Sequence, residues 1–239
     1  MQELIAPHDI IFFGRKWDQL GRKMDLIDSI SSITGIAVEP LLSIRSVFRE
    51  SIACRMSWAA RRRTTRIEDV AYSLLGIFGV HMPLLYGEGN HAFIRLQEEI
   101  MKVSDDQTVL AWGFERLEAE DYQDDSEIDR EEDQVEDKDD DEDEDFADVG
   151  VFANSPRSFR NSASLVPISH DKVSPFSMTN TGLQITLPIT EYMVATVGIL
   201  SAECNLESHR NCYLGMLLSD VGDKKDSLFN NRFKRKGTR

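Results

Sequence analysis

Residues 55–78 read RMSWAARRRTTRIEDVAYSLLGIF, and this stretch decides the fold of the first part of the chain. Its first six residues predict a short helix, and the arginine-rich RRRTTR predicts a basic turn after it. Apolar residues then recur every three or four positions, which predicts one amphipathic helix over residues 67–78, ended by Gly79. Thr65 and Glu68 stand three positions apart at its start, as the two members of a capping box do. The apolar residues of this helix are Val70, Ala71, Leu74, Leu75 and Phe78.

The flanking sequence predicts a strand and three further helices. Residues 10–13 (IIFF) form a short apolar run ended by Gly14, which predicts a buried strand. One helix should end at Gly35 as its C-cap, and another should begin at Asn90 as its N-cap. The expected apolar faces of the three helices consist of Leu26, Ile27, Ile30 and Ile33; of Ile52, Met56 and Ala59; and of Ala92, Phe93, Leu96, Ile100 and Val103.

Charge divides the chain into three parts. The chain as a whole has a net charge of −15. Residues 115–148 hold 21 Asp and Glu residues against three basic residues, a net charge of −18, whereas the remainder carries +3. Because like charges repel and few apolar groups are present, we expect residues 115–148 to be a disordered acidic linker.

The sequence after the linker has the pattern of strands. Residues 183–187 (LQITL) alternate apolar and polar side chains before Pro188, which predicts a half-buried strand. Residues 192–200 and 212–218 are two more runs rich in β-forming residues, and Gly and Asn separate them. A helical turn is expected near residues 155–159. These patterns predict a small antiparallel β domain.

We therefore expect an α+β protein. Its parts are a helix-rich N-terminal subdomain over residues 1–114, the acidic linker over 115–148 and the antiparallel β domain over 149–239. With 239 residues, 41% of them hydrophobic, the chain can bury a core. Three cysteines are too few for a disulfide scaffold, and neither a membrane span nor a signal peptide is evident in the sequence. A cytoplasmic location follows as the expectation.

Several motifs occur in order around the opening stretch. They are QELIAP at residues 2–7, MPLLYGEG at 82–89, AF at 92–93, LQ at 96–97 and SDDQ at 104–107. Together with residues 55–78 they make residues 2–112 resemble the central signature of fungal heterokaryon (vegetative) incompatibility domains. The signature residues are Arg55, Ser57, Trp58, Ala59, Arg62, Thr64, Thr65, Glu68, Asp69, Ala71, Tyr72, Leu74, Leu75, Gly76, Tyr86, Gly87, Glu88 and Gly89.

The resemblance also implies how much of that domain is present. In the family, the QELxAP motif follows a long N-terminal part with strands, so we expect residues 1–114 to be the C-terminal half of an incompatibility domain. Residues 177–183 (SMTNTGL) resemble a domain of unknown function that often follows incompatibility domains. The family takes part in non-self recognition and programmed cell death when incompatible hyphae fuse.

Two motifs could bind phosphate, and each has a simpler interpretation. Gly87, Gly89 and Ala92 imitate a dinucleotide fingerprint, but that motif needs a preceding strand, so we favour a glycine-rich helix entry and expect no cofactor. The arginines of the basic turn could contact phosphate on a nucleotide, a lipid or nucleic acid, or could be a solvated turn. Met56 and Trp58 are expected to pack in the core.

No specific metal site is expected. Cys204, His209 and Cys212 supply three zinc ligands without a fourth, and residues 139–145 lack the central glycine of a calcium loop. The basic residues Arg232, Lys234, Arg235 and Lys236 resemble a nuclear-localisation cluster, or could pair with the acidic linker.

Three functional hypotheses follow. The first is a signalling module of fungal non-self recognition that binds protein partners, rather than nucleic acid, and is not an enzyme. The second is a relative of Toll/interleukin-receptor NAD glycohydrolases whose catalytic half is missing, since Glu68 and Asp69 are candidates for catalysis only by being acidic. The third is a non-functional gene fragment.

Overall fold

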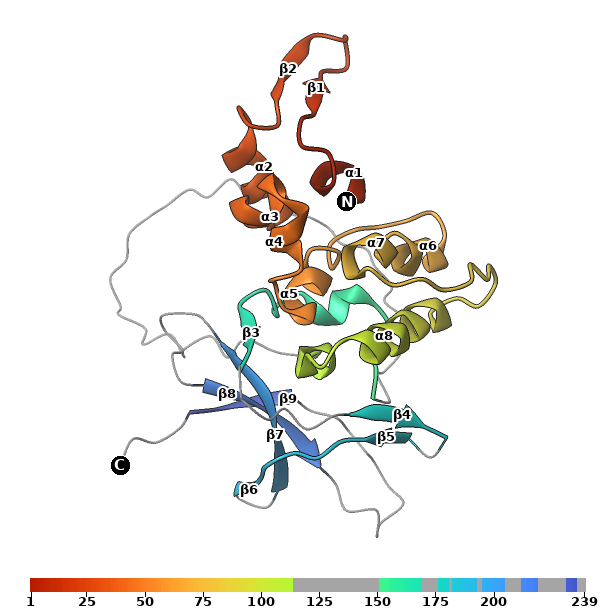
Figure 1. Ribbon diagram of the computed structural model, residues 1–239, viewed down its shortest axis with the longest axis vertical. Coiled ribbons are helices and arrows are strands. Elements are labelled where there is room, and N and C mark those ends of the chain that lie inside the picture. Colours follow the sequence, from red (N-terminus) through yellow and green to blue (C-terminus); the bar gives the residue numbers. More distant parts are fainter. Residues whose placement is uncertain are drawn as a thin grey trace, which may run out of the picture.

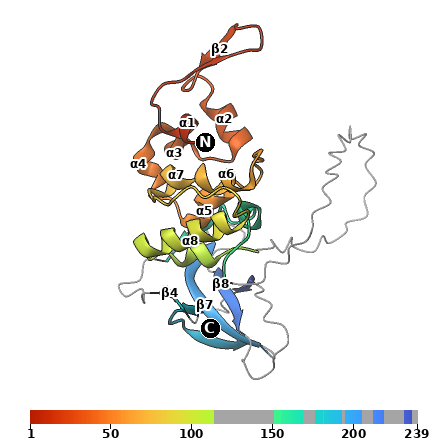
Figure 2. The same ribbon diagram turned by 90° about the vertical axis from the view of Figure 1, so that its right-hand side faces the viewer.

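A computed structural model of the protein describes residues 1–113, 151–168, 176–180, 182–192, 195–204, 212–218 and 231–235. A β-hairpin lies at one end, short helices form the middle, and strands occupy the other end (Figures 1 and 2). The α+β class is confirmed. The predicted acidic linker lies outside the described residues, and the three-part division of the chain stays a prediction.

The helices are short except for one. They are α1 (Gln2–Ile5), α2 (Ile27–Thr34), α3 (Val38–Leu42), α4 (Ile44–Val47), α5 (Ile52–Ser57), α6 (Ile67–Tyr72), α7 (Leu75–Phe78) and α8 (His91–Val103), with 3₁₀ turns η1 (Gln107–Leu110) and η2 (Pro156–Phe159). Helix α2 ends at Gly35 with φ of 68°, the left-handed C-cap that the sequence predicts. The turn expected near residues 155–159 is η2, capped by Ser155.

Helix α8 buries the predicted apolar face with one exception. Ala92, Phe93, Leu96 and Ile100 are buried, whereas Val103 in the last turn is 70% exposed. Asn90 occupies the N-cap position, but its side chain makes no capping hydrogen bond there. The periodic pattern therefore identifies the buried face of the helix correctly but extends that buried face one turn too far.

The expected single helix over residues 67–78 is two helices, and in that respect the prediction is wrong. The chain tightens at Leu74, whose amide bonds to the Ala71 carbonyl at 3.0 Å, three positions back, instead of continuing the α-helical pattern. Helix α1 lies against this break, because the side-chain Nε2 of Gln2 donates to the Ser73 carbonyl at 3.2 Å. A Cβ at Gly76 would lie 2.5 Å from Gln2 Nε2, so a larger residue at this position would displace the end of the Gln2 side chain.

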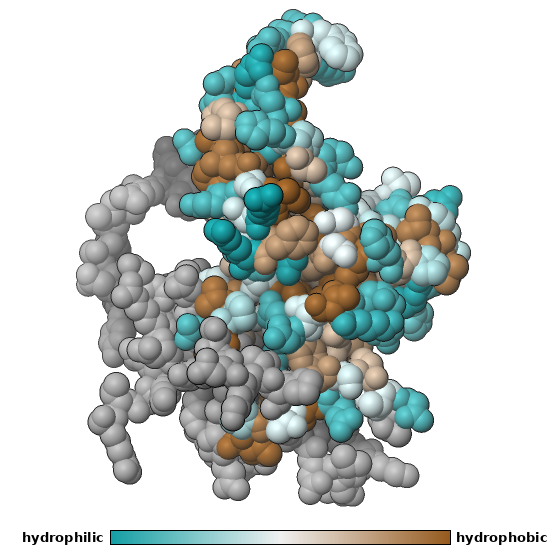
Figure 3. All heavy atoms as spheres, in the orientation of Figure 1, coloured by the Kyte–Doolittle hydropathy of each residue, from teal (hydrophilic) through white to brown (hydrophobic). Residues whose placement is uncertain are grey.

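The strand expected at residues 10–13 is present but not buried. It is β1 (Ile11–Phe13), and it pairs antiparallel with β2 (Gln19–Arg22) in a hairpin that projects from the helices (Figure 1). Phe13 is 50% exposed and Trp17 in the turn is 83% exposed. Apolar residues reach the surface along this projection in the space-filling view (Figure 3). Only Phe12 of β1 is partly buried against the core, so Ile11, Phe13 and Trp17 stay at the surface.

Residues 151–168 pack into the same core as residues 1–113. Phe159 and Leu165 belong to one continuous buried cluster with α5, α7 and α8. The Gln97 side chain of α8 donates to the Ala153 carbonyl at 2.8 Å and accepts from the Ala153 amide at 3.2 Å. The Ser51 hydroxyl donates to the Leu165 carbonyl at 2.6 Å. The segment that follows the acidic residues in sequence is thus built into the helical part.

The remaining strands are all antiparallel. Strands β3 (Leu165–Pro167), β7 (Ala195–Cys204), β8 (Cys212–Leu218) and β9 (Asn231–Arg235) form one sheet in that order, with β6 (Ile189–Tyr192) also paired to β7; β4 (Ser177–Thr179) and β5 (Gly182–Gln184) form a separate hairpin. The strand predicted at residues 212–218 is confirmed as β8. The run 192–200 is divided between β6 and β7, and the strand predicted over 183–187 ends at Gln184.

Candidate functional site

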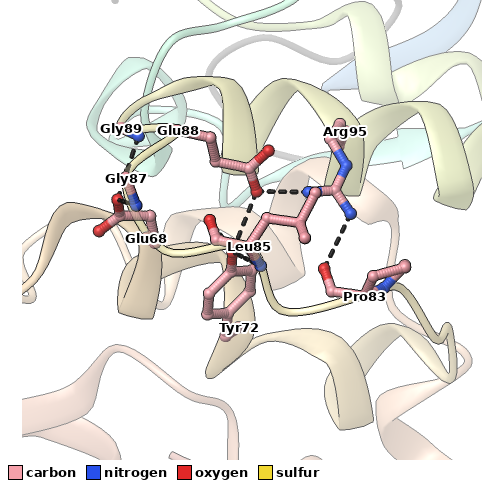
Figure 4. A network of polar contacts seen from close by, with 8 residues as sticks. All are labelled: Glu68, Tyr72, Pro83, Leu85, Gly87, Glu88, Gly89 and Arg95. Carbon is pink, nitrogen blue, oxygen red and sulfur yellow. Dashed lines mark hydrogen bonds and ion pairs between the residues drawn. The ribbon is translucent and has the colours of Figure 1, made fainter.

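The signature acidic residue Glu68 binds a glycine loop. Its Oε1 accepts hydrogen bonds from the backbone amides of Gly87 at 2.7 Å and Gly89 at 3.2 Å (Figure 4). Gly87 and Gly89 have φ of 100° and 58°, and these left-handed conformations turn both amides toward the carboxylate. Hydrogen bonds from the Glu68 amide itself, then from Gly87 and Gly89, lower the pKa of the Glu68 carboxyl. The side chain is therefore a carboxylate that fixes the loop.

This contact corrects the expected capping box. The N-cap of α6 is Arg66, and no side chain caps the helix there. Thr65 is exposed. Glu68 lies in the first turn, but its carboxylate reaches amides 19 and 21 residues further along the chain. The spacing that imitates a capping box serves a tertiary contact.

The same loop is held from its other side by Tyr72. The Tyr72 hydroxyl donates to Glu88 Oε1, at 3.0 Å, and accepts from the Leu85 amide at 2.8 Å. Arg95 of α8 forms an ion pair with Glu88 and donates to the Pro83 carbonyl at 2.8 Å (Figure 4). Burial is the main cause that raises the pKa of Tyr72, followed by the hydrogen bond to Glu88. Helices α6 and α8 are joined through this loop.

A third set of contacts lies at the outer edge of the loop. The Tyr86 hydroxyl donates to Asp69 at 3.0 Å, which is the main cause that raises the pKa of Tyr86. The Tyr86 ring meets Tyr72 edge to face at 5.5 Å between centroids, and the Arg66 guanidinium lies 4.9 Å from its centroid. Leu84 and Leu85 are both more than half exposed beside it. The loop thus has a polar, bonded inner side and an apolar outer side.

The signature residues of α5 have a structural role. Arg55 is 8% exposed, with its guanidinium 4.7 Å from the Phe78 ring centroid and its Nη1 donating to the Ile77 carbonyl at 3.2 Å. Burial lowers the pKa of this guanidinium. Met56 and Trp58 are buried, as the sequence predicts. Ser57 donates to the Cys54 carbonyl at 2.7 Å. Arg55 therefore ties α5 to α7.

The structure sorts the remaining signature positions by burial. Ala59, Ala71 and Leu74 are buried, Leu75 is half-buried, and Gly76 accommodates Gln2. Arg62 and Thr64 are exposed in the basic turn. Glu68, Asp69, Tyr72, Tyr86, Gly87, Glu88 and Gly89 are the positions that meet in one network. A role of these positions beyond the fold stays a prediction.

Sequence reasoning missed several residues that position the network. Arg95 was not singled out, and Gln97 appeared only as part of the LQ motif, yet they hold Glu88 and Ala153. Asp106 accepts from the Ile52 amide at 2.7 Å and so anchors the start of α5. Asp106 belongs to the SDDQ motif, which is the one signal that could have identified it.

The network explains why the glycine motif is not a phosphate-binding turn. A dinucleotide would need the backbone amides at the helix entry for its pyrophosphate. Here Glu68 already accepts from the amides of Gly87 and Gly89. Pro83 and the residues up to Tyr86 form no strand. The structure therefore supports the simpler interpretation of a glycine-rich helix entry.

The described part of the chain contains neither a metal-binding cluster nor a helix that could span a membrane. Its His, Cys, Asp and Glu residues form no group that could hold a metal ion, and His209 lies outside it. No described helix has the length and apolar character needed to span a bilayer.

The Cys54 thiol is buried against Glu50, with its Sγ 3.7 Å from Glu50 Oε2. Burial is the main cause that raises the pKa of this thiol to about 12.

Comparisons with known proteins agree with the sequence motifs. Residues 91–205 match a family described as Domain of unknown function (DUF8212). The chain is 49% identical over 104 residues to vegetative incompatibility protein HET-E-1 of Podospora anserina, which is 43% of this chain and 8% of that protein. The chain thus spans less than a tenth of this curated relative. No solved structure matches. The resemblance to vegetative incompatibility proteins is confirmed, and the unknown-function match begins at α8, earlier than expected.

Proposed function

From this similarity we propose that the chain acts in vegetative incompatibility, as a signalling module that binds protein partners and carries out no chemistry. The observation that carries the proposal is the 49% identity over 104 residues to HET-E-1, whose name gives vegetative incompatibility as its role. We expect the chain to take part in the growth arrest and cell death that follow contact between incompatible hyphae. We place it in the cytoplasm, with the nucleus as the alternative that the basic residues 232–236 suggest.

The arrangement of the loop supports a binding role. The carboxylates of Glu68, Asp69 and Glu88 accept hydrogen bonds from Gly87, Tyr86 and Tyr72, respectively. Each of these bonds holds the loop in place, so the three carboxylates have a structural role. The loop they fix presents Leu84, Leu85 and Tyr86 to solvent. A fixed apolar loop lowers the entropic cost of binding another protein.

The packing also favours a chain that folds over a gene fragment that folds poorly. Among the described residues, every buried side-chain nitrogen and oxygen has a hydrogen-bond partner. Native proteins show this degree of polar satisfaction, and chains that fold poorly do not.

Nicotinamide release tests the absence of chemistry against the glycohydrolase alternative. Purified full chain is incubated with NAD, and nicotinamide is quantified against buffer alone. We expect no release above buffer. Release that the substitutions Glu68→Gln or Asp69→Asn abolish would contradict the proposal and would place catalysis in the loop network.

A further inference from the structure

The arginines of the basic turn line a hollow that the proposed function does not use. Two adjoining cavities, of about 700 Å³ and about 390 Å³, lie between this turn and the segment around η2. Both cavities are lined by Ala60, Arg61, Arg62 and Arg160, so they form one basic groove. Cavities of this size are typical of small-molecule sites.

The charge of the basic groove is of one sign. Arg61, Arg62 and Arg63 enter from the turn after α5, and Arg157 and Arg160 enter from η2 and its C-cap. Of the residues that the structure describes, no Asp or Glu lines either cavity. Within the described residues, no carboxylate forms an ion pair with Arg61, Arg62 or Arg160. Like charges gathered in a hollow repel one another, and a bound anion would relieve that repulsion.

Core packing holds the two arginine-bearing segments together. Ala59 and Ala60 are buried, and their small side chains leave space above them. On the other side, Pro156 and Phe159 are buried, and the Ser162 hydroxyl donates to the Ala111 carbonyl at 3.0 Å. The Ser155 hydroxyl accepts from the Arg157 amide at 3.2 Å. The fold thus fixes the backbones that carry five arginines around one space.

The two cavities differ in chemistry. The larger cavity contains all five arginines, whereas the smaller one is also lined by Trp58, Ile33 and the hydroxyl-bearing Ser32 and Thr34. Guanidinium groups bind phosphate oxygens in pairs, so several arginines match more than one phosphate. We propose that the basic groove binds a small organic polyphosphate, with its linked phosphates in the larger cavity and its organic part in the smaller.

Electrostatics favour a small ligand over nucleic acid. Outside residues 115–148 the chain carries a net charge of only +3, so it lacks the strongly basic surface along which an extended nucleic acid would bind. At physiological ionic strength, charges farther than about 8 Å are largely screened, so a small ligand within the groove senses mainly the arginines. This inference does not depend on the signalling role.

Calorimetric titration of the full chain with ATP and with inorganic tripolyphosphate tests the proposal, in metal-free buffer at physiological salt. We expect saturable binding of both probes, with ATP tighter because its nucleoside enters the smaller cavity. Arg61→Ala and Arg160→Ala should each weaken both probes about tenfold or more, as expected for a charged hydrogen-bonded pair. The control Arg45→Ala removes an exposed arginine of α4 outside the groove and should leave both affinities unchanged.

A second variant distinguishes the two cavities. Ala163 is exposed and lines only the smaller cavity, so Ala163→Trp should weaken ATP while tripolyphosphate binds as before. Melting midpoints equal to the unsubstituted chain establish that the variants fold. Absence of saturable binding to both probes, or equal loss with Arg45→Ala, would overturn the proposal. So would a single-stranded oligonucleotide that binds more tightly than ATP and that ATP does not displace.

Discussion

Replacing Gln97 with Met should destabilise the protein by separating residues 151–168 from helix α8. Gln97 and Ala153 are both fully buried, and the Gln97 side chain satisfies both the amide and the carbonyl of Ala153. Methionine has similar length and helix propensity, so the change removes these two hydrogen bonds, and a third from the Gln97 side chain to the Phe93 carbonyl, with little change in volume or helix stability. Each buried group left without a partner costs about 1–3 kcal/mol, which gives about 2–6 kcal/mol for the pair.

Urea denaturation and hydrogen exchange together measure this effect. With a slope of about 2 kcal/mol per molar urea, the midpoint should fall by roughly 1–3 M. Exchange at the Ala153 amide should rise as well, because that amide loses its acceptor. The control Glu98→Met changes the neighbouring, half-buried position on the same helix and should shift the midpoint far less. Equal shifts for the two variants would refute the idea that Gln97 anchors residues 151–168.

Three further predictions concern stability and reactivity. Leu74→Ala should cost about 2–5 kcal/mol of unfolding free energy because Leu74 is fully buried, whereas Arg62→Ala at an exposed position should cost under about 1 kcal/mol. Equal losses in urea denaturation would contradict the burial of Leu74 in the core. The folded-state pKa of Glu68 is lowered by hydrogen bonds from its own amide and from the facing glycine amides, so the stability that Glu68 adds is present at neutral pH and is lost as pH falls through that lowered pKa. The difference in melting point between the unsubstituted chain and Glu68→Gln should therefore narrow in acid, and a difference that widens would refute the assignment. Cys54, with its pKa raised to about 12 by burial first and then by Glu50, should resist iodoacetamide at pH 8 in the native chain and react in urea, as peptide mass spectrometry can show; native labelling would contradict its burial.

Local periodicity predicted the elements that pack with their own neighbours in sequence. Helix α2 with its Gly35 cap, the buried face of α8 and strand β8 all follow from patterns of fewer than fifteen residues. The same patterns missed the break at Leu74, where a side chain from 71 positions earlier makes a contact: Gln2 donates to the Ser73 carbonyl. Periodicity detects which face is apolar, and it does not detect what covers that face.

The candidate site shows the same limit. The motifs identified Glu68, Tyr72 and Glu88 as notable, but the spacing of Thr65 and Glu68 suggested a cap, and only the fold brings Gly87 to the carboxylate. The basic groove was harder to foresee, since Arg160 lies almost one hundred residues from Arg61 and joins it through the packing of η2 on α5.

Growth of hyphae is the most direct test of the claim that this chain acts in vegetative incompatibility by binding a partner. The full chain is expressed from an inducible promoter in Podospora anserina, and growth and viability are scored after induction. We expect the unsubstituted chain and the control Val103→Asp, an exposed apolar position on α8, to arrest growth. The double variant Leu84→Asp and Leu85→Asp, which changes only exposed positions of the loop, should leave growth normal while its melting midpoint is retained. Normal growth with the unsubstituted chain, or arrest by the folded double variant, would contradict the claim.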